Sequence, residues 1–294
     1  MKRIINIMLG GLAIVCCTTK GNAQVQMSYA MDEPTFMITH KDVSKYQQLD
    51  SSRVAITYRY NFRESAADDS LKAEDDMTLL IGRNYVSFFS KNLRELDEKN
   101  TESIKTTMSF DTPEPSWQGY DILLQVAPKT LTFSNRLPFT DDVCQYTEPV
   151  PTIEWTYMPE DTATVMGYHC HAATCEYGGR KWKAYYTNNI PLPYGPWKFG
   201  GLKGMIMKVF DMNRNFVFEA EGLTQKPQPI VRYDWKYKQM TKEEWQKFEA
   251  NMYKNAGAFV KNSGVRVIIM DDSDRGFHPL NESWEQYYNP IEKR

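Results

Sequence analysis

The chain has 294 residues, of which 41% are hydrophobic, 24% charged and 13% aromatic, and its 35 basic and 37 acidic side chains leave a net charge of −2. This hydrophobic fraction is typical of a folded protein and excludes a wholly disordered chain, while the high aromatic content favours strands over helical bundles. The near balance of charge excludes nucleic acid as the main partner, because phosphate binding relies on a clear excess of basic residues.

The first 23 residues have the pattern of a secretory signal peptide. Lys2 and Arg3 precede an apolar run over residues 4–17, and Gly21-Asn22-Ala23 places small residues where a signal peptidase reads them. We therefore expect cleavage after Ala23 and an exported protein, in the periplasm or associated with the outer membrane. The run is shorter than the roughly 20 apolar residues of a membrane span. We expect no transmembrane segment in the mature chain.

A lipoprotein signal is the alternative interpretation of the same segment, with Cys16 or Cys17 acylated. Lipoprotein processing prefers a small residue before the cysteine, whereas Val15 precedes Cys16 here. Removal of residues 1–23 takes away three basic residues and no acidic residue, so the net charge changes from −2 to −5.

After an irregular arm over residues 24–47, the sequence predicts a single β-rich domain over residues 48–294. Alternation of apolar and polar side chains predicts successive strands. They cover residues 53–62, 77–81, 85–90, 121–126, 130–135, 153–157, 165–177, 181–187, 205–211, 216–222 and 231–237. Turn signals such as Gly178-Gly179 separate them and indicate hairpins. We expect a mainly β protein, with an antiparallel meander that forms an open barrel or a sandwich.

The C-terminal part changes to a helical period. Thr241 followed by Glu244 is a capping box, and apolar residues at helical spacing then predict one helix to about Asn262 that packs on the sheet. Residues 265–270 predict a final strand. Two charged stretches are predicted to be exposed loops, namely residues 64–76 and 93–105.

The most distinctive sequence lies between residues 167 and 211. It contains Gly167-Tyr168-His169-Cys170, then Gly179-Arg180-Lys181-Trp182, then Gly195-Pro196-Trp197-Lys198-Phe199, and the hexapeptide Gly201-Leu202-Lys203-Gly204-Met205-Ile206. Together with Tyr288-Asn289-Pro290-Ile291-Glu292 near the end, this order resembles the GLPGLI family of exported proteins from Gram-negative bacteria, named for its signature hexapeptide. Lys203 replaces the proline and Met205 replaces the second leucine, so the loop loses one fixed φ angle.

The resemblance extends over most of the mature chain and implies a compartment and a fold rather than a reaction. Members of the family are similar to the noncatalytic, bowl-like N-terminal domain of one class of bacterial peptide-N-glycosidase. Their genes often lie beside those of TonB-dependent outer-membrane transporters. No catalytic residue is established for the family, so none is carried over. The resemblance implies an exported binding or assembly partner of an envelope protein, such as a TonB-dependent transporter.

The signature hexapeptide itself predicts a corner between a loop and a strand. Its glycines allow backbone conformations that other residues avoid, and Leu202 can anchor the corner in an apolar core. The alternative is a recognition loop, in which nearby aromatic rings form a stacking platform for a glycan or a peptide. The rings of that platform would be Tyr185, Tyr186, Tyr194 and Trp197.

His169, His171 and the neighbouring cysteines suggest a metal site as a second hypothesis. Imidazole and thiolate are ligands of zinc and copper. On a strand, His169 and His171 share one face and Cys170 faces away, while Cys175 shares the histidine face at about 13 Å from His171. The chain would then be a periplasmic zinc- or copper-binding protein that takes a further ligand from a neighbouring strand. The alternative is an ordinary pair of surface histidines.

The mature chain keeps an odd number of cysteines, Cys144, Cys170 and Cys175. An oxidising compartment is compatible with one disulfide among them, which would leave one thiol free.

The sequence contains no serine nucleophile elbow, no HExxH motif and no Walker loop. We therefore expect a noncatalytic protein. A hydrolase that acts on a peptide or a glycan in an aromatic cleft is the third hypothesis.

Overall fold

A computed structural model describes residues 4–9, 12–17, 28–31, 35–67, 72–271 and 276–293. The predicted cleavage site after Ala23 lies outside these residues. The chain divides into two compact units. Unit 1 takes its residues from the ranges 1–37, 138–140 and 246–288, and unit 2 from 38–137, 141–245 and 289–294. Residues 48–294, for which the sequence predicts a single domain, contribute to both units.

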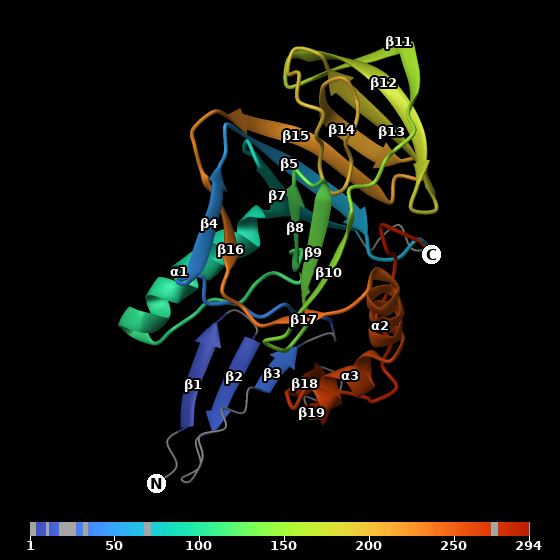
Figure 1. Ribbon diagram of the computed structural model, residues 1–294. Helices are drawn as coiled ribbons and strands as arrows, with labels where there is room; N and C mark the ends of the chain where they lie inside the picture. Colours follow the sequence, from blue (N-terminus) through green and yellow to red (C-terminus); the bar gives the residue numbers. More distant parts are fainter. Residues whose placement is uncertain are drawn as a thin grey trace. The chain divides into compact units, whose positions relative to one another are not determined.

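Unit 2 is built on one large sheet (Figure 1). Its strands are β5 (Val54–Arg63), β6 (Lys72–Ile81), β7 (Tyr85–Ser90), β8 (Tyr120–Gln125), β9 (Thr130–Arg136), β10 (Val143–Pro149), β11 (Thr156–Val165), β12 (Tyr168–Tyr177), β13 (Arg180–Thr187), β14 (Met205–Asp211), β15 (Phe216–Thr224) and β17 (Tyr237–Gln239). The spatial order is β11-β12-β13-β14-β15-β5-β6-β7-β8-β9-β10-β17. Every neighbouring pair is antiparallel except β10 and β17.

Two meanders make up this sheet, one from β11 to β15 and one from β5 to β10, and the pairing of β15 with β5 joins them. In the described part of the chain the end strands β11 and β17 do not pair with one another, so the sheet stays open. The predicted mainly β, antiparallel and open architecture is thereby confirmed.

A second, two-stranded layer formed by β4 (Tyr46–Ser51) and β16 (Pro229–Tyr233) covers part of the large sheet. Its anchor is Ile230, which is fully buried and packs with Ala55, Leu80 and Phe89 of β5, β6 and β7. Because one face of β16 supplies this contact, the opposite side of the small sheet is left for other interactions.

Helix α1 (Lys91–Thr107) corrects the prediction of an exposed loop over residues 93–105. The Ser90 hydroxyl caps the helix by accepting a hydrogen bond from the Leu93 amide at 3.1 Å. Its buried face includes Asp97 and Asn100, which are polar and therefore conceal the apolar stripe by which a helix is recognised. The loop predicted over residues 64–76 is also too long, because β6 begins at Lys72.

The strands predicted at residues 153–157 and 165–177 differ from those of the structure. The residues before Thr156 belong to no strand, although Ile153, Trp155 and Tyr157 alternate. The long strand predicted over residues 165–177 is two strands, because Met166 and Gly167 both have positive φ angles (50° and 79°) and make a turn between β11 and β12.

In unit 1, β1 (Ile4–Leu9) pairs with β2 (Leu12–Cys17), and β18 (Arg266–Asp271) lies between β3 (Ser28–Met31) and β19 (Gly276–Pro279). The final strand predicted at residues 265–270 corresponds to β18. Phe36 is buried in unit 1 and makes edge contacts with the rings of Tyr253, Phe259 and Trp284.

The predicted capping box is present at the start of α2 (Lys242–Lys254), where the Glu244 carboxylate accepts from the Thr241 amide and the Thr241 hydroxyl accepts from the Glu244 amide. The single predicted helix is divided, because α3 (Ala256–Asn262) follows after a break at Asn255. None of the helices in the described ranges has the length and apolar character to cross a membrane.

Candidate functional site

The signature region forms a closed aromatic core. Trp182 and Trp197 are buried, with exposed fractions of 0% and 4%, and Phe199 lies against both, at ring-centroid distances of 4.7 and 5.4 Å. The Trp182 indole donates to the Tyr177 carbonyl at 2.9 Å. Trp197 therefore packs in the core and presents no face for a ligand. We call Tyr177, Trp182, Trp197 and Phe199 the signature core.

The hexapeptide lies at the corner where this core meets β14. Leu202, Met205 and Ile206 are buried, and the Ile206 carbonyl accepts from the Tyr58 hydroxyl at 2.7 Å. A Cβ on Gly204 would lie 2.0 Å from the Thr187 carbonyl oxygen, so only glycine fits. Gly201 has a φ of 87°, and the Lys203 ammonium lies over the Tyr157 ring at 5.9 Å. The burial of these side chains and the tight packing at Gly204 agree with the prediction that the hexapeptide forms a corner between a loop and a strand.

An ionic cluster closes one side of the signature core. Lys198 has a side chain that is 1% exposed, and its ammonium donates to Glu148 at 2.6 Å and to Glu292 at 2.9 Å. Lys242 binds the same two carboxylates. Burial alone would raise the pKa of Glu292, but the Lys198 and Lys242 ammonium groups outweigh it and lower that pKa.

The same cluster holds residues 289–293, which we call the C-terminal strap, on unit 2. Arg180 donates to the Asn289 side chain and to the Pro290 carbonyl, both at 2.7 Å, and the Lys293 amide donates to the Gly178 carbonyl at 2.7 Å. The buried charges have partners and are used to fix this segment, which is a structural role.

The remaining members of the predicted platform are dispersed around β13. Tyr185 is half-buried and donates to Asp161 at 3.0 Å. Tyr186 is buried beside His171, with ring centroids 6.2 Å apart. Tyr194 is half-buried and pairs through its backbone with Gly200. With Trp197 in the core, the four rings do not form one exposed surface.

The histidine rings of β12 lie where the strand pattern predicts. His169 and His171 share a face, with ring centroids 5.0 Å apart, and Cys170 is buried on the opposite face. Across the described ranges, no group of three or more His, Cys, Asp or Glu side chains is placed to hold a metal ion. A metal on the histidine pair would need ligands from elsewhere.

Cys144, Cys170 and Cys175 are buried and free, and none of the three is joined to another. Burial raises the pKa of Cys144 and Cys170 to about 11 and that of Cys175 to about 12, so these thiols are protonated and poorly nucleophilic at neutral pH.

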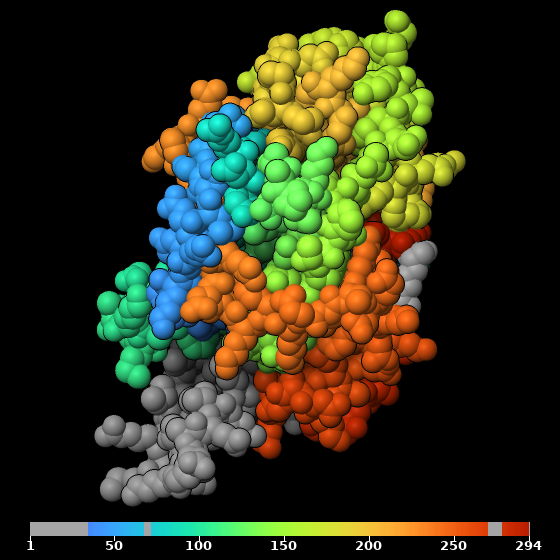
Figure 2. Space-filling model, viewed as in Figure 1, coloured from blue at the N-terminus to red at the C-terminus, as the bar shows by residue number. Residues whose placement is uncertain are grey.

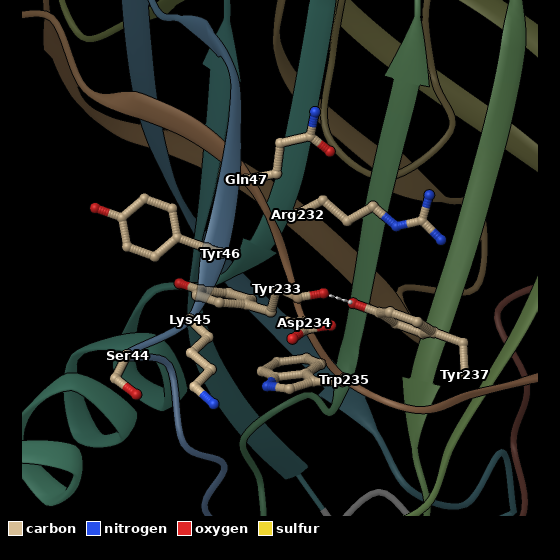
Figure 3. Close-up of a pocket in the computed structure, with 9 residues that line it drawn as sticks. All are labelled: Ser44, Lys45, Tyr46, Gln47, Arg232, Tyr233, Asp234, Trp235 and Tyr237. Atoms are coloured by element: carbon tan, nitrogen blue, oxygen red, sulfur yellow. Dashed lines mark hydrogen bonds between the residues drawn. The ribbon is translucent and has the colours of Figure 1, made fainter.

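A different group of aromatic residues lines an open cleft of unit 2, between β4 and the segment that follows β16. The cleft has a volume of about 580 Å³. It is lined by Ser44, Lys45, Tyr46, Gln47, Arg232, Tyr233, Asp234, Trp235 and Tyr237 (Figure 3). Figure 2 shows the blue surface of β4 beside the orange surface of the segment that contains β16 and β17.

Four aromatic side chains line this cleft. We call Tyr46, Tyr233, Trp235 and Tyr237 the aromatic ladder. Tyr233 and Trp235 stack with centroids 4.7 Å apart and an interplanar angle of 18°. Tyr46 meets Tyr233 edge-on at 6.3 Å because the two residues are cross-strand partners. Tyr237 lies 6.3 Å from Trp235. Tyr46 is 54% exposed, so its ring is available to a ligand.

Local hydrogen bonds hold the ladder in place. The Trp235 indole donates to the Asp42 carbonyl at 2.8 Å, and the Tyr237 hydroxyl donates to the Tyr233 carbonyl at 3.1 Å. The Asp234 amide donates to the Lys45 carbonyl at 3.0 Å and ties the segment to the chain before β4. Burial raises the pKa of Tyr237 to about 12, so its hydroxyl keeps its proton at neutral pH.

Cations behind the ladder support its rings. The Arg136 guanidinium lies 4.8 Å from the Trp235 centroid and is itself buried in an ion pair with Asp97 of α1. The Arg94 guanidinium, also from α1, lies 5.4 Å from the Tyr233 centroid. Cations over aromatic faces attract them electrostatically, so these two guanidinium groups help to hold the rings of Tyr233 and Trp235 in place.

Polar side chains at the mouth of the cleft are free to bind a ligand. Within the described part of the chain, the side chains of Lys45, Gln47 and Asp234 make no hydrogen bond or ion pair. The Arg232 guanidinium lies 5.3 Å from the Tyr237 centroid and has no carboxylate partner among the described residues. The cleft thus combines fixed rings with uncommitted donors and acceptors.

Sequence reasoning missed this site. Tyr233, Trp235 and Tyr237 form an alternating series, which predicts one strand over residues 231–237. In the structure β16 ends at Tyr233 and β17 begins at Tyr237, so the middle of the series is a loop. Tyr46 falls in the predicted irregular arm, and only the pairing of β4 with β16 brings it to the cleft.

No family model matches the chain, and no curated protein matches it. The structures of PNGF-II in space groups P21 and C2 are similar over 70% of this chain and 34% of theirs, at 13% sequence identity and TM-scores of 0.44 and 0.45. The chain therefore spans about a third of PNGF-II. A likeness at this level carries no argument about activity.

Proposed function

We propose that this chain is a noncatalytic binding protein of the cell envelope, and that its ligand occupies the aromatic cleft. The observation that carries the proposal is the cleft of about 580 Å³, which is lined by the aromatic ladder and by polar side chains that have no partner among the described residues. Concave sites lined by aromatic rings and a few convergent polar groups are the usual form of a small-ligand site.

The envelope part of the proposal rests on the sequence. The signal-peptide pattern of residues 1–23 supports export, and the resemblance to the GLPGLI family supports a role beside another envelope component, such as a TonB-dependent transporter. The partner would supply or receive the ligand of the cleft. The charged groups around Lys198 are paired with one another and hold the C-terminal strap.

Affinity capture from native envelope extract tests this function. The bait is the wild-type chain, and Tyr46→Ala removes the most exposed ring of the ladder. Tyr157→Ala is the matched control, because Tyr157 is 45% exposed on β11, outside the cleft. We expect an envelope component that is retained by the wild type and the control and lost with Tyr46→Ala. Equal retention by all three, or saturable turnover of a peptide or glycan library, would contradict the proposal.

A second candidate function, the binding of zinc or copper, is favoured by the histidine pair on β12. Ring centroids 5.0 Å apart on one strand face allow both imidazoles to approach one ion. Metal analysis after native purification tests it, with the double variant His169→Ala/His171→Ala and with His278→Ala as the control for loss of a histidine elsewhere. We expect metal in the wild type and control only. Equal metal content in the double variant would exclude the site.

A further inference from the structure

We propose that the free edge of β4 is a docking surface for an extended polypeptide segment of a partner protein, which adds to the small sheet as a further strand. This surface is the outer edge of the strand and not the cleft, so the proposal goes beyond the binding function above. It follows from the direction of the backbone groups of β4, from a contrast with the other end strands of unit 2 and from the side chains beside the edge.

The hydrogen-bonding pattern of the small sheet shows which backbone groups of β4 point away from β16. Just before β4, the Asp234 amide donates to the carbonyl of the opposed residue Lys45 at 3.0 Å. In an antiparallel pair, residue pairs that exchange hydrogen bonds alternate with pairs that do not. Tyr46 and its partner Tyr233 are therefore a pair without hydrogen bonds, and the same holds for Gln48 two residues later. The N–H and C=O groups of Tyr46 and Gln48 thus point outwards.

These outward groups form a template for another strand. In the described part of the chain β4 pairs only with β16, and the outward groups make no hydrogen bond there (Figure 1). Tyr46, Gln47 and Gln48 are all exposed. An extended main chain presents donors and acceptors at every second residue, as this edge does, and pairs with it through main-chain hydrogen bonds. The regular template ends at Leu49, where the register of the small sheet shifts.

The other end strands of the two sheets in unit 2 carry features that hinder such pairing. The register of β11 shifts at a bulge that contains Pro159, Glu160 and Asp161. Strand β17 has only three residues, one of which is Lys238. Strand β16 begins with Pro229, whose nitrogen has no hydrogen to donate. Bulges, prolines, charges and short length are the usual means by which proteins keep edges from pairing. Residues 46–48 contain neither a proline nor a charge, so this edge is left open.

The side chains beside the edge indicate what kind of segment fits. The Tyr46 ring is 54% exposed and lies on the side of the strand away from Gln47 (Figure 3). An added strand contacts both faces of β4, because its own side chains alternate. Apolar or aromatic side chains of the segment pack beside Tyr46, and polar side chains lie beside Gln47. The Lys45 ammonium has no ion pair within the described residues, so acidic side chains among the polar ones add attraction.

A second copy of this chain is the alternative occupant. Two copies that pair antiparallel through β4 each bring the irregularity at Leu49, so the two strands diverge on both sides of residues 46–48. A separate segment has no such irregularity of its own and can follow β4 further. We therefore assign the edge to a partner polypeptide.

Fluorescence anisotropy with labelled peptides tests the proposal on the purified chain. The probes are heptapeptides with blocked ends in which glutamate alternates with valine, tyrosine or threonine. We expect at least one of the three to bind saturably. The control is a heptapeptide of alternating glutamate and proline, which lacks half of the donors and should not bind. Failure of all three probes, or equal binding of the proline control, would overturn the proposal.

Methylated forms of the bound peptide test the geometry. One form carries methyl groups on the amide nitrogens of the glutamates, and the other carries them on the residues between. A strand bonds to one neighbour through alternate residues only. We therefore expect one form to bind like the parent peptide and the other to bind at least about tenfold more weakly. Equal affinities of the two forms would show that the peptide does not bind as a strand.

Two variants at Gln48 place the peptide on β4. Gln48→Pro removes an N–H that points away from β16, whereas Gln48→Ala keeps it. Gln48 does not line the cleft. We expect the proline variant to bind the peptide at least about tenfold more weakly than the alanine variant, at a similar melting temperature. Equal affinities would overturn the assignment to this edge. If the proline variant does not fold, the two methylated peptides decide the question.

Two further measurements separate the proposal from its neighbours. Sedimentation should show a monomeric wild type. A dimer that Gln48→Pro dissociates, together with no peptide binding, would assign the edge to a second copy and overturn the proposal. If envelope capture depends on Tyr46 while no peptide binds, strand addition is wrong and the binding function stands. If a peptide binds at the edge while capture fails, the edge stands and the envelope function is wrong.

Discussion

The signature core and the aromatic ladder are both groups of packed rings with cations beside them, but they differ in what is left unsatisfied. In the signature core Trp197 is 4% exposed, and the nearby Lys198 ammonium has two carboxylate partners. In the ladder Tyr46 is 54% exposed, and in the same cleft the side chains of Gln47, Arg232 and Asp234 lack hydrogen-bond and ion-pair partners within the described residues. The presence of aromatic residues does not identify a binding site. Our proposed binding site rests instead on a cleft whose lining includes polar side chains without partners among the described residues.

This difference predicts that substitutions in the signature core change stability and that substitutions in the cleft change binding. The largest effect is expected for Gly204→Ala. Its new Cβ would lie 2.0 Å from a backbone oxygen that cannot move aside easily, so we expect a loss of more than about 4 kcal/mol in the free energy of unfolding.

Urea unfolding or, where the protein does not fold, soluble yield measures this effect. Gly167→Ala is the control, because Gly167 has a φ of 79° but a Cβ there would meet nothing within 4 Å. It should cost only the backbone strain of about 1 kcal/mol. Similar losses in the two variants would show that the close contact at Gly204 is not what fixes the corner.

A pair of aromatic truncations compares the two regions directly. Trp197→Ala empties a buried position and should cost about 3 to 4 kcal/mol of unfolding free energy. Tyr46→Ala removes an exposed ring and should change stability by no more than about 0.5 kcal/mol. Denaturant titration of both variants measures the contrast. Equal destabilisation would end the distinction between a closed core and an open site.

The buried carboxyl of Asp75 on β6 makes the stability of the chain depend on pH. This carboxyl is 2% exposed and lies opposite Tyr60, which stacks on Phe218. Burial raises its pKa to about 7 despite hydrogen bonds from the Gln118 amide and Asn92. The folded state then holds a proton that the unfolded state has released, so stability falls as the pH rises from about 4 to about 7.

Asp75→Asn should remove that slope and stabilise the chain above pH 7, by up to about 3 kcal/mol. Melting temperatures of the wild type and the variant across pH 4–8 measure the difference. A wild-type stability that rises over this range in step with that of the variant would contradict the raised pKa.

A smaller loss of stability than in the signature core is expected at the C-terminal strap. Glu292→Gln keeps the shape of the side chain but removes its charge from Lys198 and Lys242, and should cost about 1 to 2 kcal/mol at neutral pH. Because the folded pKa of Glu292 is lowered, its contribution is present above its ordinary pKa and is lost as the pH falls through the folded value. The variant should therefore lose less stability than the wild type on acidification below about pH 4.5. Parallel acid denaturation curves would contradict this.

Much of the fold follows from side-chain periodicity. The alternation in Val54–Arg63 and the helical spacing after Thr241 each correspond to an element of the structure. Helix α1 escapes prediction because Asp97 is buried, and it is buried because Arg136 of β9 pairs with it. Sequence spacing cannot show a partner 39 residues away.

The candidate site is predicted less well than the fold. The cleft depends on Tyr46 and Tyr233 being cross-strand partners, a contact between residues far apart in the sequence. Conversely, Trp197 lies beside glycines, a composition shared by exposed loops and tight corners, and only its burial distinguishes them. The sequence predicts that His169 and His171 share a face, because both residues lie within one strand.

The C-terminal strap has a consequence for the order in which this chain can fold. Unit 2 is interrupted by residues 246–288 and is completed only when residues 289–293 reach Arg180 and Lys198. During synthesis the first 245 residues emerge without the segment that adds the remaining partners of these buried cations, so the unit remains incomplete until about 50 further residues have followed. Unit 2 therefore gains its full set of buried hydrogen bonds and ion pairs only after the C-terminal strap has been made.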